Sequence, residues 1–224
     1  MRRVLGRLPV FMVLLAVLLL GDVVYEEYGS NIVAARRAAS VRETLRSEWR
    51  EVPSAVERPV TTAPTSSTPR RSKGFALLYV PRLRATAWEL PVLSGTSDRE
   101  LNSGVGHHQD SALPWQEGNV VLSGHRTSYG RPFAEIEKLR IGDQVFLETR
   151  DAWYVYTLVD DAIVKPDALW VKAVAPTSAL AGESKVITLI TCTPKGSVDK
   201  RWVWWGKLTE VRAKADPPAG VRQS

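Results

Sequence analysis

Cys192 is the only thiol in the 224 residues, and it ends an apolar, β-branched run that predicts a strand. The reactive form of a thiol is the thiolate, and an ordinary cysteine pKa of about 8.5 leaves it mostly protonated near neutral pH. A cysteine therefore needs a neighbouring base or cation before it attacks a carbonyl. Taken alone, a single cysteine is more often a small buried hydrophobic residue.

Two further side chains could supply what the thiol needs. His125 follows the strand-like run "NVVLSG", and an imidazole can activate a thiol and then protonate a leaving amine. Arg201 opens the run "RWVWWGKL" nine residues after Cys192, a spacing that suits a loop between two neighbouring strand ends. Its guanidinium could hold an anionic intermediate. The alternatives are a structural histidine and an arginine paired with Asp199 or Asp161.

The composition limits which other sites the chain can build. One cysteine allows no intramolecular disulfide and no multi-cysteine metal site. His107 and His108 are adjacent, so on a strand they point to opposite faces. The net charge of +6 comes mainly from the first 73 residues, and the near-neutral remainder lacks the basic footprint of a nucleic-acid-binding domain. We expect no metal, no cofactor and no nucleic-acid partner.

The N-terminus has the pattern of a membrane anchor. Three arginines among residues 1–7 precede an apolar run, and residues 8–27 approach the roughly 20 residues that cross a bilayer. Asp22 falls near an interface, where a charge is tolerated. The arginines predict a single-pass protein of the cell membrane, with residues 1–7 cytoplasmic and the rest extracytoplasmic. The alternative is a cleaved signal peptide, although no tidy A-x-A site closely follows the run.

Residues 28–73 divide into a helix and a spacer. Residues 30–51 are rich in Ala, Arg, Glu and Leu and predict a helix. Its apolar stripe is thin, so we expect a solvated juxtamembrane stalk. Residues 52–69 are rich in Pro, Ser and Thr and predict a disordered linker, because they hold too little apolar surface to fold.

Residues 74–212 change to short runs rich in Val, Ile, Tyr, Trp and Thr, separated by turn signals. Single helical turns are expected in "TSDRELNSG" and "RPFAEIEKL". In 153–159 and 201–207 large residues occupy both the odd and the even positions, which indicates strands covered on both sides. Many short strands with little helix favour an all-β barrel or sandwich. Residues 213–224 are expected to form a disordered tail.

Three segments together resemble the sortase family. "TLITCTP" is similar to the family's T-L-x-T-C strand end, with Cys192 in the nucleophile position. "NVVLSGHR" resembles its histidine segment, matching His125, and "RWVWWGKL" resembles the strand that opens with its active-site arginine, matching Arg201. The first strands and the stretch "GVGHHQDSALPWQEGN" are also similar. The resemblance covers residues 75–211 and is greatest to class E sortases of high-GC Gram-positive bacteria.

The resemblance implies a closed eight-stranded β-barrel with short helices and a cysteine transpeptidase. Cys192 would attack the Thr–Gly bond of a sorting signal of the LPXTG or LAXTG kind and form a thioacyl enzyme. His125 would protonate the departing amine and deprotonate the incoming one, while Arg201 would stabilise the oxyanion. The partners implied are secreted surface proteins that carry the signal and a peptidoglycan-precursor amine.

Other positions of the motifs are less determined by the resemblance. Thr191 either shapes the pocket for the signal or is an ordinary strand threonine. His107 matches a family histidine outside the trio and receives no catalytic role. The chain has "QDS" at 109–111 where the family often has P-G-T, and Trp115 where it often has Gly. These departures fall in a loop before the histidine strand and bear on substrate preference.

Two other functions fit parts of the pattern. An L,D-transpeptidase also places His before Cys on a β-rich fold, but its H-G and S-x-G-C signatures are absent. A membrane-tethered barrel that binds wall components without catalysis is the other alternative. The occupation of all three trio positions favours the enzyme.

Overall fold

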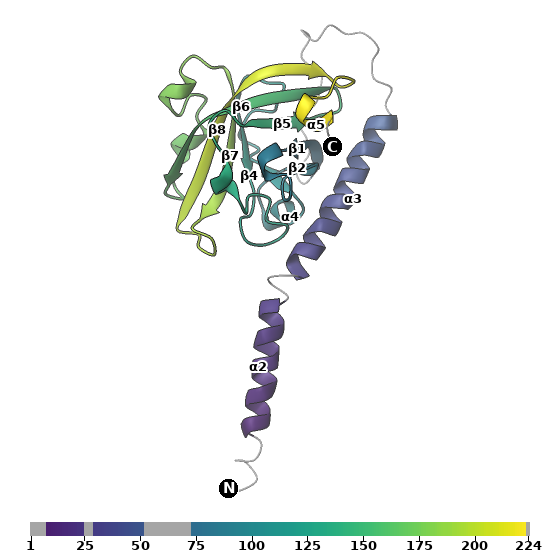
Figure 1. Ribbon diagram of the computed structural model, residues 1–224, viewed down its shortest axis with the longest axis vertical. Coiled ribbons are helices and arrows are strands. Elements are labelled where there is room, and N and C mark those ends of the chain that lie inside the picture. Colours follow the sequence, from purple (N-terminus) through teal and green to yellow (C-terminus); the bar gives the residue numbers. More distant parts are fainter. Residues whose placement is uncertain (1–7, 25–28, 52–72, 223–224) are drawn as a thin grey trace.

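The computed structural model describes residues 8–24, 29–51 and 73–222. Its centre is a closed eight-stranded barrel in the order β1-β2-β3-β4-β7-β8-β6-β5, so the predicted barrel is confirmed (Figure 1). The strands are β1 Gly74–Tyr79, β2 Leu90–Ser94, β3 Val105–His107, β4 Gly118–Ser123, β5 Gln144–Glu148, β6 Ala152–Val164, β7 Lys185–Thr193 and β8 Lys200–Ala213.

Short helices lie between the strands, and two longer helices precede the barrel. Both predicted single turns are present, as α4 Asp98–Leu101 and η3 Ile136–Lys138. The helical elements are α2 Leu8–Val24, α3 Ser30–Glu51, η2 Pro81–Leu83, α4 Asp98–Leu101, η3 Ile136–Lys138, η4 Leu169–Lys172, η5 Ser178–Leu180 and α5 Ala219–Arg222.

Strands β6 and β8 are packed on both faces, as the large residues at both odd and even positions predicted. Tyr154 and Tyr156 belong to the interior core, whereas Trp153 and Val155 pack outward. On β8 the same alternation puts Trp204 inside the barrel and Trp205 in a separate outer cluster. Alternate side chains of a strand point to opposite faces, so one barrel can support an inner core and outer layers.

Two outer layers cover the barrel. Between β6 and β7, Val171 and Leu180 close over the outward side chains of β4, β7 and β8. On the far side, α3 and the C-terminal segment cover β1, β5 and β6. The first of these layers borders the active site described below.

Helix α3 is docked on the barrel and is not the solvated stalk that its sequence predicted. Figure 1 shows it lying alongside the barrel. Ala34 and Leu45 are buried, and Val41 and Trp49 pack with Leu45 in the outer core. Gly74 permits the close approach, since a Cβ there would lie 3.0 Å from a Val41 methyl carbon. The buried positions recur every three to four residues, which is the period of an amphipathic helix.

Charged groups fix the C-terminal half of α3. Arg46 donates to Glu89 at 2.9 Å and to the Tyr79 hydroxyl at 3.2 Å. Tyr79 in turn donates to the buried carboxylate of Glu148 at 2.5 Å, and Lys214 donates to the same carboxylate at 2.5 Å. Burial and the Glu148 charge raise the pKa of Tyr79, so its hydroxyl stays a donor.

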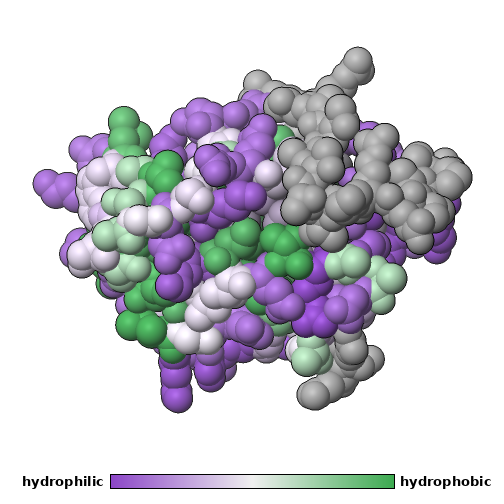
Figure 2. All heavy atoms as spheres, turned by 90° about the horizontal axis from the view of Figure 1, so that it is seen from above, coloured by the Kyte–Doolittle hydropathy of each residue, from purple (hydrophilic) through white to green (hydrophobic). Residues whose placement is uncertain are grey.

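Helix α2 differs from α3 in both composition and surroundings. Its side chains from residue 11 to residue 21 are exposed, and Leu18 is 71% exposed. Within the described residues, no helix combines the length and the apolar character that a membrane crossing requires. The barrel surface, in contrast, mixes hydrophilic and hydrophobic side chains in the view from above (Figure 2).

The segments outside the barrel are described only in part. The linker of residues 52–69 and the end of the expected anchor at 25–27 lie outside the described residues. The segment from 213 to 222 departs from the expected disordered tail. Its Lys214 is the Glu148 partner described above, α5 follows, and Val221 packs against the outer core. The buried carboxylate of Glu148 explains the order, because it requires a cationic partner.

Candidate active site

Cys192 and Arg201 stand opposite each other at the open end of the β7–β8 hairpin. In the antiparallel register their Cα atoms are direct partners, as are those of Ile190 and Val203 two residues further in. Directly opposite residues have their side chains on the same face of the sheet. Ile190 and Val203 belong to the outer cluster, so Cys192 and Arg201 also face outward. The prediction that the intervening loop brings these two strand ends together is confirmed.

His125 reaches the same face from β4. Strands β4 and β7 are parallel, with Ser123 opposite Ile190, and two further residues along each chain lead to His125 and Cys192. The pairing continues past the strand end, since Gly124 N–H donates to the Ile190 carbonyl at 3.1 Å. A Cβ on Gly124 would lie 2.8 Å from the Pro132 ring, so glycine is required here.

The imidazole of His125 is held between two side chains. Nε2 lies 3.0 Å from the amide oxygen of Asn102, which can only accept, so Nε2 carries a proton and Nδ1 is the basic nitrogen. The ring of Tyr129 lies against the imidazole, with centroids 5.5 Å apart. Partial burial lowers the pKa of His125, although the Asp98 charge opposes the effect. The neutral imidazole is therefore favoured at neutral pH.

Arg201 bends over its own loop. Its Nη1 donates to the carbonyls of Val198 at 2.8 Å and Lys200 at 3.0 Å. Among the described residues no ion pair joins Arg201 to Asp199 or Asp161, and Asp161 accepts a hydrogen bond from Trp202 Nε1 at 2.8 Å. Carbonyl contacts of this kind are exchanged more readily than a salt bridge, so the guanidinium can turn toward a developing anion.

No hydrogen bond joins the thiol to the imidazole within the described part of the chain. Both side chains are partly exposed, and the strands that carry them are paired. Catalytic contacts commonly tighten only when substrate binds. The thiol and the imidazole therefore lie two residues past one paired position of β4 and β7, without direct contact.

Thr191 does not face this site. It is buried on the inner side of β7, and its hydroxyl donates to the Gly124 carbonyl at 2.7 Å. The alternation that turns Cys192 outward turns its neighbour inward. This placement favours the alternative of a structural strand threonine: Thr191 ties the cysteine strand to the segment that carries the histidine.

Arg126, which the sequence patterns did not single out, supports the cysteine strand from the inner side. Its side chain is 7% exposed, and Nη1 donates to the Thr193 hydroxyl at 2.6 Å and contacts the Cys192 carbonyl at 3.4 Å. Nη2 donates to Glu137 at 2.9 Å. The available signal was an arginine directly after the histidine, where alternation turns it inward. Asn102 was also missed, and local sequence gives no sign that the end of α4 meets His125.

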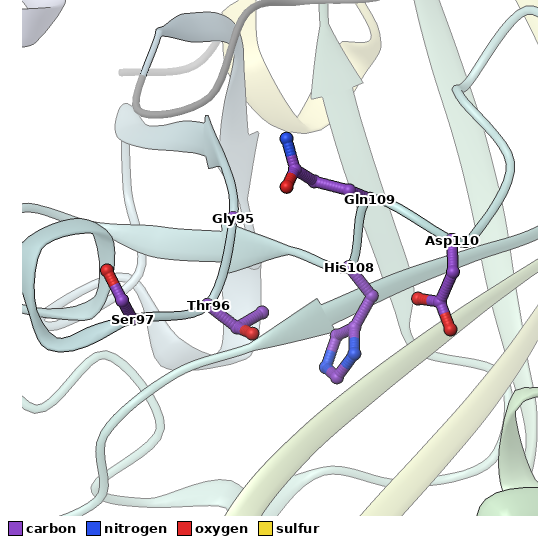
Figure 3. A pocket seen from close by; sticks show the side chains of 6 residues that line it. All are labelled: Gly95, Thr96, Ser97, His108, Gln109 and Asp110. Carbon is purple, nitrogen blue, oxygen red and sulfur yellow. The ribbon is translucent and has the colours of Figure 1, made fainter.

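A polar cavity of about 500 Å³ lies beside the histidine strand. Figure 3 shows its lining from two loops, one with Gly95, Thr96 and Ser97 and the other with His108, Gln109 and Asp110. The unusual "QDS" loop thus forms one wall. Asp110 is tied to Lys172 of the β6–β7 connection at 2.7 Å, which holds that wall in place.

The adjacent histidines point apart, as predicted. His107 lies inside the barrel against Phe75, and its Nε2 is 2.9 Å from the Ala112 carbonyl. His108 faces outward, where Nε2 is 2.8 Å from the Ser123 hydroxyl. Burial lowers the pKa of both imidazoles. The unusual Trp115 packs against the interior core with its ring edge-on to Phe75.

Comparison with known proteins assigns the chain to a family. The model of the sortase domain matches residues 78–209, more than half of the chain. The chain belongs to the sortase family. It is 32% identical over 216 residues to sortase SrtE1 of Streptomyces coelicolor, a match that covers 92% of this chain but 58% of that protein. It is also 32% identical to SrtE2 of the same organism, over 89% of this chain and 81% of that protein.

A solved sortase shares the fold. The crystal structure of sortase E1 from Streptomyces coelicolor with a tripeptide in its active site is 32% identical, with a TM-score of 0.61, and the match covers 67% of this chain and 97% of that one. The predicted resemblance to class E sortases is confirmed. Membership of the family removes the L,D-transpeptidase alternative.

Proposed function

We propose that the chain is a cysteine transpeptidase that cleaves a sorting signal between Thr and Gly and transfers the acyl part to an amine. The observation that carries the proposal is the convergence of Cys192, His125 and Arg201 on the outer face, at the ends of three neighbouring strands. Membership of the sortase family supports the same reaction class.

The first half of the reaction uses the thiol and the imidazole. Cys192 Sγ, as thiolate, attacks the Thr carbonyl carbon, and the oxygen becomes an oxyanion that the Arg201 guanidinium can stabilise. The tetrahedral intermediate collapses as the C–N bond breaks, and the His125 imidazolium gives its proton to the departing glycine amine. A thioester remains on Cys192. In the second half an acceptor amine attacks it, His125 takes the amine proton, and the thiolate leaves.

The lowered pKa of His125 bears on which protonation state reacts. The neutral thiol and neutral imidazole dominate between the two ordinary pKa values of about 6.5 and 8.5. Partial burial of His125 reduces the imidazolium fraction further. The reactive thiolate–imidazolium pair is therefore a minor species, which reacts with bound substrate and is restored by proton transfer between the two groups.

The sorting signal is proposed to be of the LAXTG or LPXTG kind, with a peptidoglycan-precursor amine as acceptor. Similarity to two Streptomyces class E sortases supports this. Val171 and Leu180 form a buried apolar layer over the outward side chains of β4 and β7, and the polar cavity of Figure 3 includes Asp110, the partner of Lys172.

The decisive experiment incubates the purified full chain with LAXTG and LPXTG peptides, with and without a short amine acceptor. The expected result is cleavage between Thr and Gly, a thioacyl adduct on Cys192 by mass spectrometry, and a transfer product when the amine is present. Cys192→Ala is expected to abolish all three while the circular dichroism spectrum stays unchanged. An intact peptide with the wild-type chain would support the non-catalytic wall-binding barrel instead.

We further propose that α2 anchors the protein in the cell membrane and holds the barrel on the extracytoplasmic side. The support is an apolar helix whose described side chains are exposed all round, preceded by three arginines. Fractionation is expected to find the intact protein in membranes. A shortened form found only in the soluble fraction would favour signal-peptide cleavage.

A further inference from the structure

Helix α3 extends from the charged cluster at Glu148 toward the active-site end of the barrel. Its 22 residues span about 33 Å at 1.5 Å per residue. The C-terminal half is fixed by Arg46 and by Trp49, whose ring lies 4.0 Å from the Lys214 ammonium. The helix is therefore held firmly at one end, and its N-terminal turn has a defined position relative to the barrel.

The N-terminal turn of α3 contacts the segment that follows the histidine. Asn31 Oδ1 accepts a hydrogen bond from Gly130 N–H at 2.8 Å. Ala34, which is 3% exposed, packs over the same residue: a Cβ on Gly130 would lie 3.6 Å from the Ala34 Cβ. Two side chains of α3, Asn31 and Ala34, thus contact the backbone at Gly130.

That position is the centre of a strained turn. Tyr129, Gly130 and Arg131 have φ values of 50°, 79° and 37°. L-residues avoid the left-handed region, so Tyr129 and Arg131 hold it only because surrounding contacts over-determine it. Arg131 N–H closes the turn on the Ser128 carbonyl at 3.0 Å, and Asn31 of α3 adds the contact from outside.

The turn controls a side chain that touches the active-site imidazole. Tyr129 lies against His125 with ring centroids 5.5 Å apart and planes 38° apart. Asn102 holds Nε2 at 3.0 Å, so the two contacts together limit rotation of the ring. If the turn relaxed, Tyr129 would leave the imidazole and admit water to a group whose pKa is lowered by burial.

We propose that α3 positions His125 for catalysis through Asn31, the turn at Gly130 and the ring of Tyr129. The proposal rests on the catalytic role proposed above for His125. Asn31 and Tyr129 are positioning residues, because neither supplies a group to the reaction. The helix that follows the apolar α2 thereby becomes part of the active-site framework.

The test compares full-length variants by two readouts, NMR titration of the His125 ring and steady-state cleavage of a sorting-signal peptide. Asn31→Ala is expected to raise the pKa of His125 toward the ordinary 6.5 and to lower kcat roughly tenfold with little change in KM. Asn31→Asp keeps an acceptor oxygen and is expected to restore both. Ser40→Ala, an exposed position on the same helix, is the matched control and is expected to change neither.

Tyr129→Gly separates positioning from fold stability. It removes the ring and relieves the left-handed backbone, so its Tm is expected not to fall while the pKa of His125 rises and kcat drops. A wild-type His125 titration and kcat in both Asn31→Ala and Tyr129→Gly would overturn the proposal. The titration needs no substrate, so a chain that cleaves no peptide but shows the pKa change would refute the proposed function and leave the positioning intact.

Discussion

The outer and inner faces of the β7–β8 hairpin differ in the exposure and hydrogen bonding of their side chains. Outside, Cys192 and Arg201 are partly exposed and make only backbone or no hydrogen bonds among the described residues. Inside, Thr191 and Thr193 are buried and each is engaged by a specific hydrogen bond. Residues that alternate along β7 thus have different roles: the outward one is proposed to react, and the inward ones hold the strand in place. The comparison predicts that outer substitutions cost activity alone, whereas inner substitutions cost stability as well.

Arg201→Lys gives the largest effect expected among variants that keep the thiol. A point charge cannot reproduce the planar fork of a guanidinium, so stabilisation of the oxyanion is lost. We expect kcat/KM to fall by about 10² or more, the range seen when one oxyanion donor is removed, with Tm unchanged. Peptide-cleavage kinetics and thermal melting measure the two quantities. Retained kcat/KM would return Arg201 to a structural role on its loop.

Arg126→Met tests the inner face. The substitution leaves the Thr193 hydroxyl and the Cys192 carbonyl without their buried donor, although the partly exposed Glu137 can be solvated. We expect a loss of about 1 to 3 kcal/mol in the free energy of unfolding and a smaller loss of kcat than in Arg201→Lys. Urea denaturation measures the first. Arg140→Met, at an exposed arginine outside the site, is a control for general effects of losing a positive charge. An unchanged unfolding curve for Arg126→Met would contradict the support role.

Sequence patterns predicted the barrel and the outer face better than the inner face. Strand ends are marked by short apolar runs, and the spacing from Cys192 to Arg201 is a local quantity that a hairpin loop preserves. Contacts such as Asn102 to His125 depend on how distant segments pack, which local patterns do not encode. Helix α3 shows the limit most clearly. Its buried positions do follow a helical period, but small and scattered apolar residues such as Ala34 hid the docking face.

Thr191→Val isolates one inner hydrogen bond. Valine matches the shape of threonine but leaves the Gly124 carbonyl without its donor, so the cysteine strand loses one tie to the histidine segment. We expect a cost of about 1 to 3 kcal/mol in the free energy of unfolding and a modest loss of kcat. Thr191→Ser keeps the hydroxyl and is expected to retain most of the wild-type kcat. A large rise in KM for Thr191→Val with normal stability would instead indicate direct contact with the sorting signal.

The pH dependence of activity gives the smallest and most specific effect. Burial lowers the pKa of His125, so protonation of the free enzyme to the cationic, inactive thiol–imidazolium form requires a pH below the ordinary value. The acid limb of kcat/KM is therefore expected below about pH 6.5. Peptide cleavage measured from pH 5 to 9, with circular dichroism at each pH to separate unfolding from titration, checks it. An acid limb at or above pH 6.5 would mean that His125 is as solvated as a free imidazole. The contacts with Tyr129 and Asn102 would then have no effect on its pKa.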